Sequence, residues 1–304
     1  MKIFVTGGTG FVGRTLIRHL VTKGHEMIIL SRHTSKTPAI PEKVSYIKGD
    51  PTLEGPWQNE VSHCDAIINL AGASIFCRWT KSKKKQIMDS RILTTRNIVK
   101  ALAPRKGKKT LFLSTSAVGY YGFREDEELD ENSPIGEGFL SSVTRDWEVA
   151  AMQAAESDAQ VTLLRFGVVL GRDGGALRQL VPLFKKYLGS PLGNGKQWFS
   201  WIHELDLAHI YSFVLDHRGI SGPINCTAPQ PVRNRDMTKI LGEALGKPTF
   251  MPAIPAFVIR ILMGEFGTTL LKGQKVLPKK LLESGFNFRF PELGVALKDL
   301  LSPL

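Results

Sequence analysis

The residues TGGTGFVG at 6–13 constrain the fold more than any other stretch of this 304-residue chain. They follow an apolar run at 2–6 that predicts a strand, and they open an amphipathic stretch that predicts a helix. In this context Gly7 permits a tight turn, Gly10 lets the backbone approach a diphosphate, and Gly13 lets the helix pack closely on the sheet. The diphosphate would bind the free N–H groups at the start of the helix. A glycine-rich turn without a ligand is the alternative.

Short apolar runs alternate with longer amphipathic stretches along the first 170 residues. Near-continuous apolar strands separated by helices are typical of a parallel sheet covered on both faces. We therefore predict an α/β fold, with a Rossmann-like doubly wound parallel sheet over residues 1–170. A smaller, mostly helical lobe over 171–304, sharing some elements with the first domain, would cap the carboxyl ends of the strands and select the substrate. The predicted strands are KIFVT (2–6), EMIIL (26–30), VSYIK (44–48), DAIIN (65–69), TLFLS (110–114) and VTLLR (161–165). Helices are predicted at 11–24, 83–103, 139–148 and 204–217, and a loop that leads into a helix at 171–189.

The second predicted strand ends in LSRH at 30–33. An acidic residue at this place, about twenty positions after the glycines, would hold the ribose 2′-hydroxyl of NAD. Ser31 and Arg32 offer a hydroxyl and a guanidinium instead, and His33 and Lys36 add positive charge nearby. Because Arg is suited to a bidentate grip on a phosphate, we predict NADP as the cofactor. A surface Arg after a strand is the alternative.

The net charge of +12 comes largely from two local runs. KSKKK at 81–85 and PRKGKK at 104–109 lie near the two ends of one predicted helix. Such a face could contact phosphates, but short Lys runs usually form a solvated surface. No zinc-finger, helix-turn-helix or RNP pattern accompanies them. We therefore expect no nucleic-acid partner.

The remaining composition points to an unexported protein without a metal. No run of 18 apolar residues appears, and the N-terminus enters a strand pattern with no apolar signal region. The three cysteines, Cys64, Cys77 and Cys226, are widely spaced and form no C-x-x-C pair, which suggests neither a disulfide framework nor a zinc site. We expect a cytoplasmic protein with no membrane partner.

Several motifs resemble the extended short-chain dehydrogenase/reductase family. G-x-x-G-x-x-G at 7–13, INLAG at 68–72 and LSTSAVGYYG at 113–122 are similar to its cofactor and active-site elements. WIHELDLA at 201–208 looks like the element that leads into a helix near the substrate. LLKGQKVLPKKLLESGFNFRFPELGVALKDLL at 270–301 resembles the C-terminal segment of the atypical, sugar-nucleotide-epimerase-like branch, so the resemblance covers essentially the whole chain.

The resemblance implies where NADP would lie. The glycine-rich turn would hold the diphosphate, the end of the second strand the adenosine 2′ side, and the turn after the fourth strand the ribose and nicotinamide side. Arg91 would be a second contact, unless it is a surface Arg. Val168 and Val169 would place backbone against the nicotinamide amide, or form a buried β-branched pair. The implied cofactor residues are Gly7, Thr9, Gly10, Phe11, Val12, Gly13, Ser31, Arg32, Leu70, Ala71, Gly72, Arg91, Ser114, Val168 and Val169.

The family's catalytic Tyr and Lys are missing. In its enzymes a Tyr four residues before a Lys transfers a hydroxyl proton while hydride moves to or from the nicotinamide. No Tyr lies between 122 and 186, and no Lys between 110 and 184. If Glu148 is the acid that usually follows in that helix, Leu140 and Thr144 occupy the two places. Neither residue can titrate usefully.

Three residues remain as catalytic candidates. Ser116 matches the family's active-site hydroxyl. Tyr120 and Tyr121 follow the fifth predicted strand, where one of them could replace the missing proton donor or both could pack as a pocket wall. His203, close to Asp206, is a further titratable residue in a segment whose usual work is structural or substrate binding. Arg145 and Asp146 could pair with each other or bind substrate.

We predict an NADP-binding, epimerase-like oxidoreductase acting on a small hydroxylated or carbonyl substrate. A protein that binds NADP without turnover, as a sensor or scaffold, is the alternative, and relatives of this branch have been linked to division of cells or plastids. A surface-binding role of the basic helix is a third reading. The substrate is not indicated, and a homodimer formed through the long helices would follow from fold analogy alone.

Overall fold

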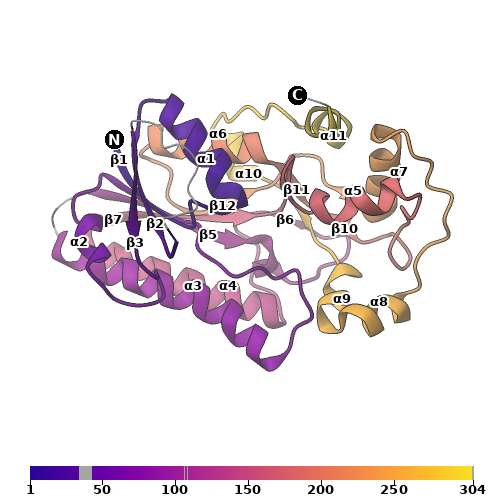
Figure 1. Cartoon of the computed structure of the whole chain (residues 1–304), viewed down its shortest axis with the longest axis horizontal. Helices are drawn as coiled ribbons and strands as arrows, with labels where there is room; N and C mark the ends of the chain where they lie inside the picture. The colour runs from indigo at the N-terminus through magenta and orange to yellow at the C-terminus, as the bar shows by residue number, and fades with distance from the viewer. Residues whose placement is uncertain (34–42, 106, 108, 303–304) are drawn as a thin grey trace.

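A seven-stranded parallel sheet forms the centre of the computed structural model, which describes residues 1–33, 43–105, 107 and 109–302 (Figure 1). The strand order is β12-β7-β5-β4-β1-β2-β3, and every neighbouring pair is parallel. The chain order reverses between β1 and β4, which makes this the switch point of the sheet. The strands are β1 (Lys2–Thr6), β2 (Glu26–Ser31), β3 (Val44–Lys48), β4 (Ala66–Asn69), β5 (Thr110–Ala117), β7 (Ala159–Phe166) and β12 (Gly222–Cys226).

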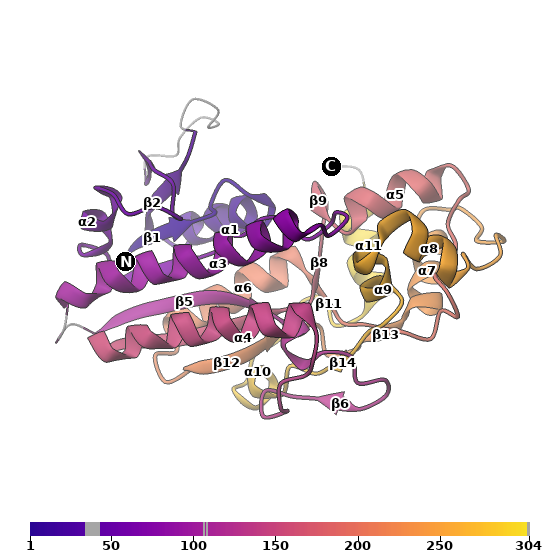
Figure 2. The ribbon, with the colours of Figure 1, turned by 90° about the horizontal axis from the view of Figure 1, so that it is seen from below.

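Helices cover both faces of this sheet (Figure 2). One face packs on α1 (Phe11–Thr22) and α6 (Glu204–Asp216), and the other on α2 (Trp57–Val61), α3 (Lys81–Leu102) and α4 (Phe139–Met152). Successive side chains of a strand point to opposite faces. Ile3 and Val5 therefore enter the core between the sheet and α1 and α6, called the first core here, and Phe4 enters the second core on the opposite face. Both faces are therefore apolar, as the near-continuous hydrophobic strands predicted.

A second lobe continues from the carboxyl edge of the sheet, on the right in Figure 1. Its core joins α5, α7 and α11 to Leu170 and Trp201. Its helices are α5 (Leu177–Lys185), α7 (Asn234–Ala244), α8 (Ala256–Met263), α9 (Glu265–Leu270) and α11 (Leu293–Leu301), whereas α10 (Lys279–Glu283) packs beside β12 on the same face of the sheet as α6. Short ladders complete it: β11 (Trp201–His203) with β8 (Val168–Gly171) and β9 (Gly174–Gly175), β10 (Trp198–Phe199) with β13 (Val232–Arg233), and β14 (Lys275–Val276) with β6 (Glu128–Leu129). The described residues also form 3₁₀ turns earlier in the chain, at η1 (Ala103–Arg105), η2 (Val118–Tyr121) and η3 (Gln153–Ser157).

The predicted fold class is confirmed, all six predicted strands and the helices predicted at 11–24, 83–103, 139–148 and 204–217 are present to within a few residues, and the helix expected within 171–189 is α5. Three elements beyond residue 170, α6, β12 and α10, belong to the sheet and its cover rather than to the lobe. The strand β12 escaped prediction because its short GPINC run opens with Gly and Pro, a composition tolerated at a sheet edge. In the part of the chain that the structure describes, no helix combines the length and the apolar character needed to cross a membrane.

Candidate functional site

The glycine-rich turn lies at the switch point of the sheet. Gly7 has φ +72°, and a Cβ added there would lie 2.6 Å from the carbonyl carbon of Leu70. A Cβ on Gly13 would lie 2.5 Å from the carbonyl oxygens of Gly7 and Gly8. Real side chains do not tolerate such contacts, so only glycine fits either position. The turn is thereby pressed against the loop that follows β4.

The first turn of α1 is left open to an anion. Gly10 is its N-cap, no side chain caps the helix, and no acidic residue lies in its first turn. A helix start presents N–H groups that lack intrahelical partners, together with the positive end of the helix dipole. Thr9 and Gly10 are exposed beside it, and Val12 packs partly on the first core. These features fit a bound diphosphate.

The Phe11 side chain packs directly against glycine residues. A Cβ on Gly174 would lie 2.2 Å from the Phe11 ring, and one on Gly171 2.4 Å from it. The ring therefore rests directly on the backbone of the β8–β9 hairpin. Its side chain serves packing, and its backbone N–H is the group available to a diphosphate.

The end of β2 carries the residues expected at the 2′ side of the cofactor. The Ser31 hydroxyl donates to the carbonyl oxygen of His33 (2.9 Å) and accepts from its backbone N–H (3.3 Å), which closes a local turn. Arg32 and His33 are exposed at the carboxyl edge of the sheet. Lys36 lies outside the described residues. The exposed guanidinium of Arg32 can thus reach a phosphate in the adjoining solvent.

Asn69 holds the turn after β4. Its Oδ1 accepts from the hydroxyl of Thr6 (2.7 Å) and from the backbone N–H of Ala71 (3.3 Å), and its Nδ2 donates to the hydroxyl of Thr95 (2.9 Å). Every polar group of this buried side chain is used. Leu70 and Ala71 are half-buried and Gly72 is exposed. The turn is therefore fixed where it borders the glycine-rich loop.

Arg91 reaches this turn from α3. Its guanidinium donates to the carbonyl oxygens of Ala73 and Ile87, both at 3.1 Å, and a Cβ on Gly72 would lie 3.1 Å from its central carbon. Burial lowers the pKa of Arg91 to about 10. Its contacts are neutral carbonyls, so a cation held in this way favours an anionic ligand at the same edge.

A buried polar network occupies the expected catalytic centre. Ser116 at the end of β5 donates to Glu148 Oε1 of α4 (2.6 Å). Arg165 of β7 forms a bidentate pair with Glu148, with both N–O distances at 2.8 Å. Glu148 is 7% and Arg165 3% exposed. Desolvating two charges is offset only by such complete hydrogen bonding.

The two tyrosines divide between the inside and the outside of this network. Tyr121 is fully buried; its hydroxyl donates to Asn225 Oδ1 (2.7 Å) and accepts from Arg165 (2.9 Å). Burial raises the pKa of Tyr121 to about 12. Tyr120 is half-exposed, and its ring face lies 3.5 Å from the Arg165 guanidinium. Of the three catalytic candidates, only Tyr120 keeps an accessible surface.

The places of the missing Tyr and Lys are filled by packing. Leu140 lies against Gly119, where a Cβ would be 3.2 Å from its own Cβ, and joins an apolar cluster around Trp79 and Phe266. The Thr144 hydroxyl donates to the carbonyl oxygen of Leu140 within its own helix (2.9 Å). Neither side chain bonds to Ser116, which is held by Glu148 one turn further along α4.

Glu148 and Arg165 are the site residues that sequence reasoning left without a role. A signal was present, because Arg165 interrupts the apolar run VTLLRF of β7. A charged residue in a buried strand needs a partner, and an acid in the neighbouring helix is the natural candidate.

His203 and Asp206 contact residues near the C-terminus, among them Phe290, and make no hydrogen bond to the glycine-rich turn. The His203 ring stacks on Phe290 with centroids 3.8 Å apart, and its Nδ1 accepts from the backbone N–H of Leu205 (3.0 Å). Burial lowers the pKa of His203 to about 4, so the ring is neutral near pH 7. Arg145 and Asp146 pair with each other on the exposed side of α4 (2.9 Å).

The last implied cofactor residues have unequal access. Val168 and Val169 are half-buried on β8, where they pair with Trp201 and Ile202 of β11. Ser114 is fully buried in β5, and its hydroxyl has no hydrogen-bond partner among the described residues. The valines are thus only partly covered, whereas Ser114 has no exposed surface for direct contact.

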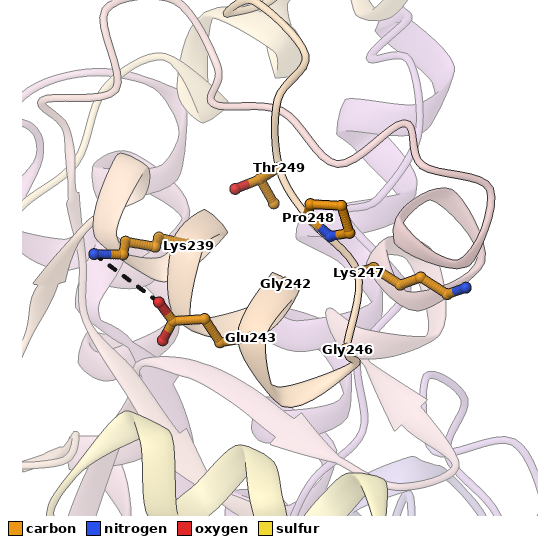
Figure 3. Close-up of a pocket in the computed structure, with 7 residues that line it drawn as sticks. All are labelled: Lys239, Gly242, Glu243, Gly246, Lys247, Pro248 and Thr249. Atoms are coloured by element: carbon orange, nitrogen blue, oxygen red, sulfur yellow. Dashed lines mark ion pairs between the residues drawn. The ribbon is translucent and has the colours of Figure 1, made fainter.

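Two surface hollows lie away from the glycine-rich turn. One of about 350 Å³ lies at the end of α7 and the loop after it, where Lys239 and Glu243 form an ion pair of 3.9 Å (Figure 3). The other, about 440 Å³, runs along the outer side of α4 and includes Tyr120 and Glu148. Within the described ranges, no group of three His, Cys, Asp or Glu side chains is arranged to hold a metal ion.

Comparisons with known proteins cover the whole chain. The sequence model of the NAD dependent epimerase/dehydratase family matches residues 3–226, and that of a domain of unknown function (DUF1731) matches 254–300. The epimerase family protein SDR39U1 homolog, chloroplastic, of Arabidopsis thaliana is 41% identical over 99% of this chain and 87% of its own. Epimerase family protein YfhF of Bacillus subtilis is 37% identical over 99% and 98%. The crystal structure of human epimerase family protein SDR39U1 with NADPH has a TM-score of 0.85, 34% identity and 99% coverage of both chains. The resemblance stated from the motifs is confirmed.

Proposed function

The chain belongs to the NAD dependent epimerase/dehydratase family, and we propose that it binds NADP(H) across the carboxyl edge of its sheet. The observation that carries this proposal is the uncapped start of α1 beneath a turn whose Gly7 and Gly13 admit no side chain. The NADPH in the human relative, similar over 99% of both chains, supports the same cofactor here.

The proposed cofactor contacts follow the geometry of that edge. The backbone N–H groups from Phe11 onward would hold the diphosphate. Arg32 would pair with the 2′-phosphate, with Ser31 beside it. Arg91 would lie at the turn formed by Leu70, Ala71 and Gly72, and the backbone of Val168 and Val169 would border the nicotinamide. Ser114 would act only from behind the strand, because it is fully buried.

We infer that the bound cofactor serves an oxidoreductase or epimerase-like reaction on a small hydroxylated or carbonyl substrate. NADP(H), when bound, supplies or accepts the hydride. The hydroxyls of Ser116 and Tyr121 are engaged within the buried network. A proton that follows the hydride would therefore come from Tyr120 or from solvent. The lack of a positioned Tyr–Lys pair predicts slow turnover, since proton transfer contributes about 10²–10⁴-fold in typical enzymes.

A second function, NADP binding without turnover, is favoured by the same network. Ser116, Glu148, Arg165 and Tyr121 are hydrogen-bonded in one chain that ends on Asn225. Such a network stabilises the fold without offering a group to substrate. A sensor or scaffold would need no more than this.

Titration with NADPH and NADH, followed by NADPH oxidation against aldehydes, quinones and keto-sugars, separates these functions. NADPH should bind more tightly than NADH, and Arg32→Ala should remove that preference. Arg218→Ala, an exposed residue just before β12 at the opposite edge of the sheet, is the matched control. Turnover that falls in Tyr120→Phe assigns an enzyme, binding without turnover assigns a sensor or scaffold, and no binding of either nucleotide overturns the proposal.

A further inference from the structure

The C-terminal segment, defined here as residues 286–302, docks on the start of α6. Its anchor is Asp206, which is fully buried. Asp206 Oδ1 accepts from the backbone N–H of Arg289 and Oδ2 from that of Phe290, both at 2.9 Å. The Asp206 carboxylate thus fixes two consecutive residues of the segment. Charge-assisted bonds of this kind are stronger than neutral ones.

Two further residues hold the same segment. The ring of Phe290 stacks on His203, whose Nε2 lies 3.4 Å from Asp299 Oδ2. The side chain of Arg172 donates to the carbonyl oxygen of Asp299 (2.6 Å) and to that of Ser302. Three residues outside the segment, Arg172, His203 and Asp206, therefore bind it over most of its length.

The same short stretch is also bonded to the proposed cofactor helix. Glu204, between His203 and Asp206, accepts from the Thr15 hydroxyl of α1 through Oε2 (2.7 Å). Its Oε1 accepts from the backbone N–H of Arg172 (2.9 Å). The β8–β9 hairpin, whose turn contains Arg172, supplies the glycine backbone on which the Phe11 ring rests. One carboxylate thus ties α1 to the elements that hold the C-terminal segment.

We infer that the C-terminal segment is a positioning element of the cofactor site, acting through Arg172, His203, Asp206 and Glu204 on the start of α1. This inference rests on the proposed NADP site. It assigns a role to part of the region that matches a domain of unknown function. Fixing α1 before the cofactor arrives lowers the ordering cost of binding. By reciprocity, bound cofactor must strengthen the docking of the segment to the same degree.

Hydrogen exchange of the Arg289 and Phe290 amides, measured by NMR on the full chain with and without saturating NADPH, tests the linkage. NADPH should slow both amides, on the order of tenfold, because opening the segment would forfeit part of the binding energy. Thr15→Val removes the bond to Glu204 but leaves every contact of the segment in place. In this variant NADPH should still bind, while its effect on the two amides should largely disappear.

A second variant measures how the docking of the C-terminal segment affects NADPH binding. Asp206→Asn exchanges one carboxylate oxygen for an amide donor facing a backbone N–H, and should weaken NADPH binding about tenfold, within the usual range of coupling. Asp216→Asn, exposed at the other end of α6, should bind NADPH like the native chain. A purely structural segment would lower the melting temperature of Asp206→Asn without changing its NADPH dissociation constant.

The outcomes separate the inference from the proposed function. If the native chain binds no NADPH, the proposed cofactor site fails. If it binds NADPH but the two amides exchange at unchanged rates, or if Thr15→Val keeps the full protection, the cofactor site stands and the positioning role is overturned. Protection in the native chain that is lost in Thr15→Val establishes the role, even if Asp206→Asn fails to fold.

Discussion

Ser116 donates a hydrogen bond to Glu148 across 2.6 Å, from the end of β5 to the third turn of α4. Ser116 lies where the resemblance places the active-site serine, whereas Glu148 lies one turn beyond Thr144, the place of the missing lysine. Glu148 is simultaneously the counter-ion of Arg165. The hydroxyl is therefore part of the packing of α4 on the sheet as much as a candidate for chemistry.

Neutralising Glu148 should destabilise the chain. Glu148→Gln leaves the Arg165 guanidinium 3% exposed and without its counter-ion. We expect a loss of about 3 kcal/mol in the free energy of unfolding, as when one partner of a buried ion pair is removed. Urea unfolding measures it, with Glu156→Gln on the exposed side of η3 as the control. A change as small as that of the control would contradict the buried pair.

Substituting alanine for glycine should lower stability at one helical position and raise it at another. In Gly13→Ala the new Cβ would lie 2.5 Å from two backbone oxygens, so the turn must move and both stability and NADPH affinity should fall. In Gly294→Ala, inside α11, the nearest atom is 3.9 Å away, so helix propensity should raise stability by up to about 1 kcal/mol. Melting temperatures of both variants test the pair. Equal shifts would argue against the close approach at Gly13.

Removing the hydroxyl group should destabilise the protein at Tyr121 but not at Tyr120. Tyr121→Phe removes the buried hydrogen-bond partner of Asn225 Oδ1 and of Arg165 Nη1, and should cost about 1–3 kcal/mol. Tyr120→Phe keeps the ring that lies 3.5 Å from the Arg165 guanidinium and should unfold like the native chain. Denaturant titration of both variants gives the comparison. If Tyr120→Phe lost more unfolding free energy than Tyr121→Phe, the assignment of Tyr121 to the buried network would be wrong.

Acid should weaken the fold through His203. Its pKa is lowered from 6.5 to about 4 by burial, so the unfolded chain binds this proton more readily than the folded one. The resulting stability is fully present above pH 6.5, declines as the pH falls below that value, and is lost around pH 4. His203→Asn can still cap α6 but cannot titrate, so its stability should depend less steeply on pH across this window. Unfolding free energies of both proteins at pH 7 and pH 5 provide the test.

Local patterns predicted the parts of the molecule that depend on neighbours in sequence. The turn around Gly7, the apolar strands and α3 all follow from spacing within a few residues. The cofactor residues, the cytoplasmic location and a homodimer stay predictions. Sequence alone could not tell Tyr121 from Tyr120, because their roles depend on Asn225 and Arg165, which are distant along the chain. The docking of Phe290 on His203 likewise joins residues that no local pattern connects.

The insertion of β12 at the edge of the sheet also sets the order in which the protein can be completed during synthesis. The first apolar core contains Ile3 and Val5 from β1 but also Leu207 and Tyr211 from α6 and Ile224 from β12. A nascent chain that has emerged only to residue 170 presents one face of its sheet with α1 alone to cover it. Exposed apolar surface of this kind is what aggregates and what chaperones bind. This core is complete only when Phe286, its last buried residue along the sequence, has left the ribosome.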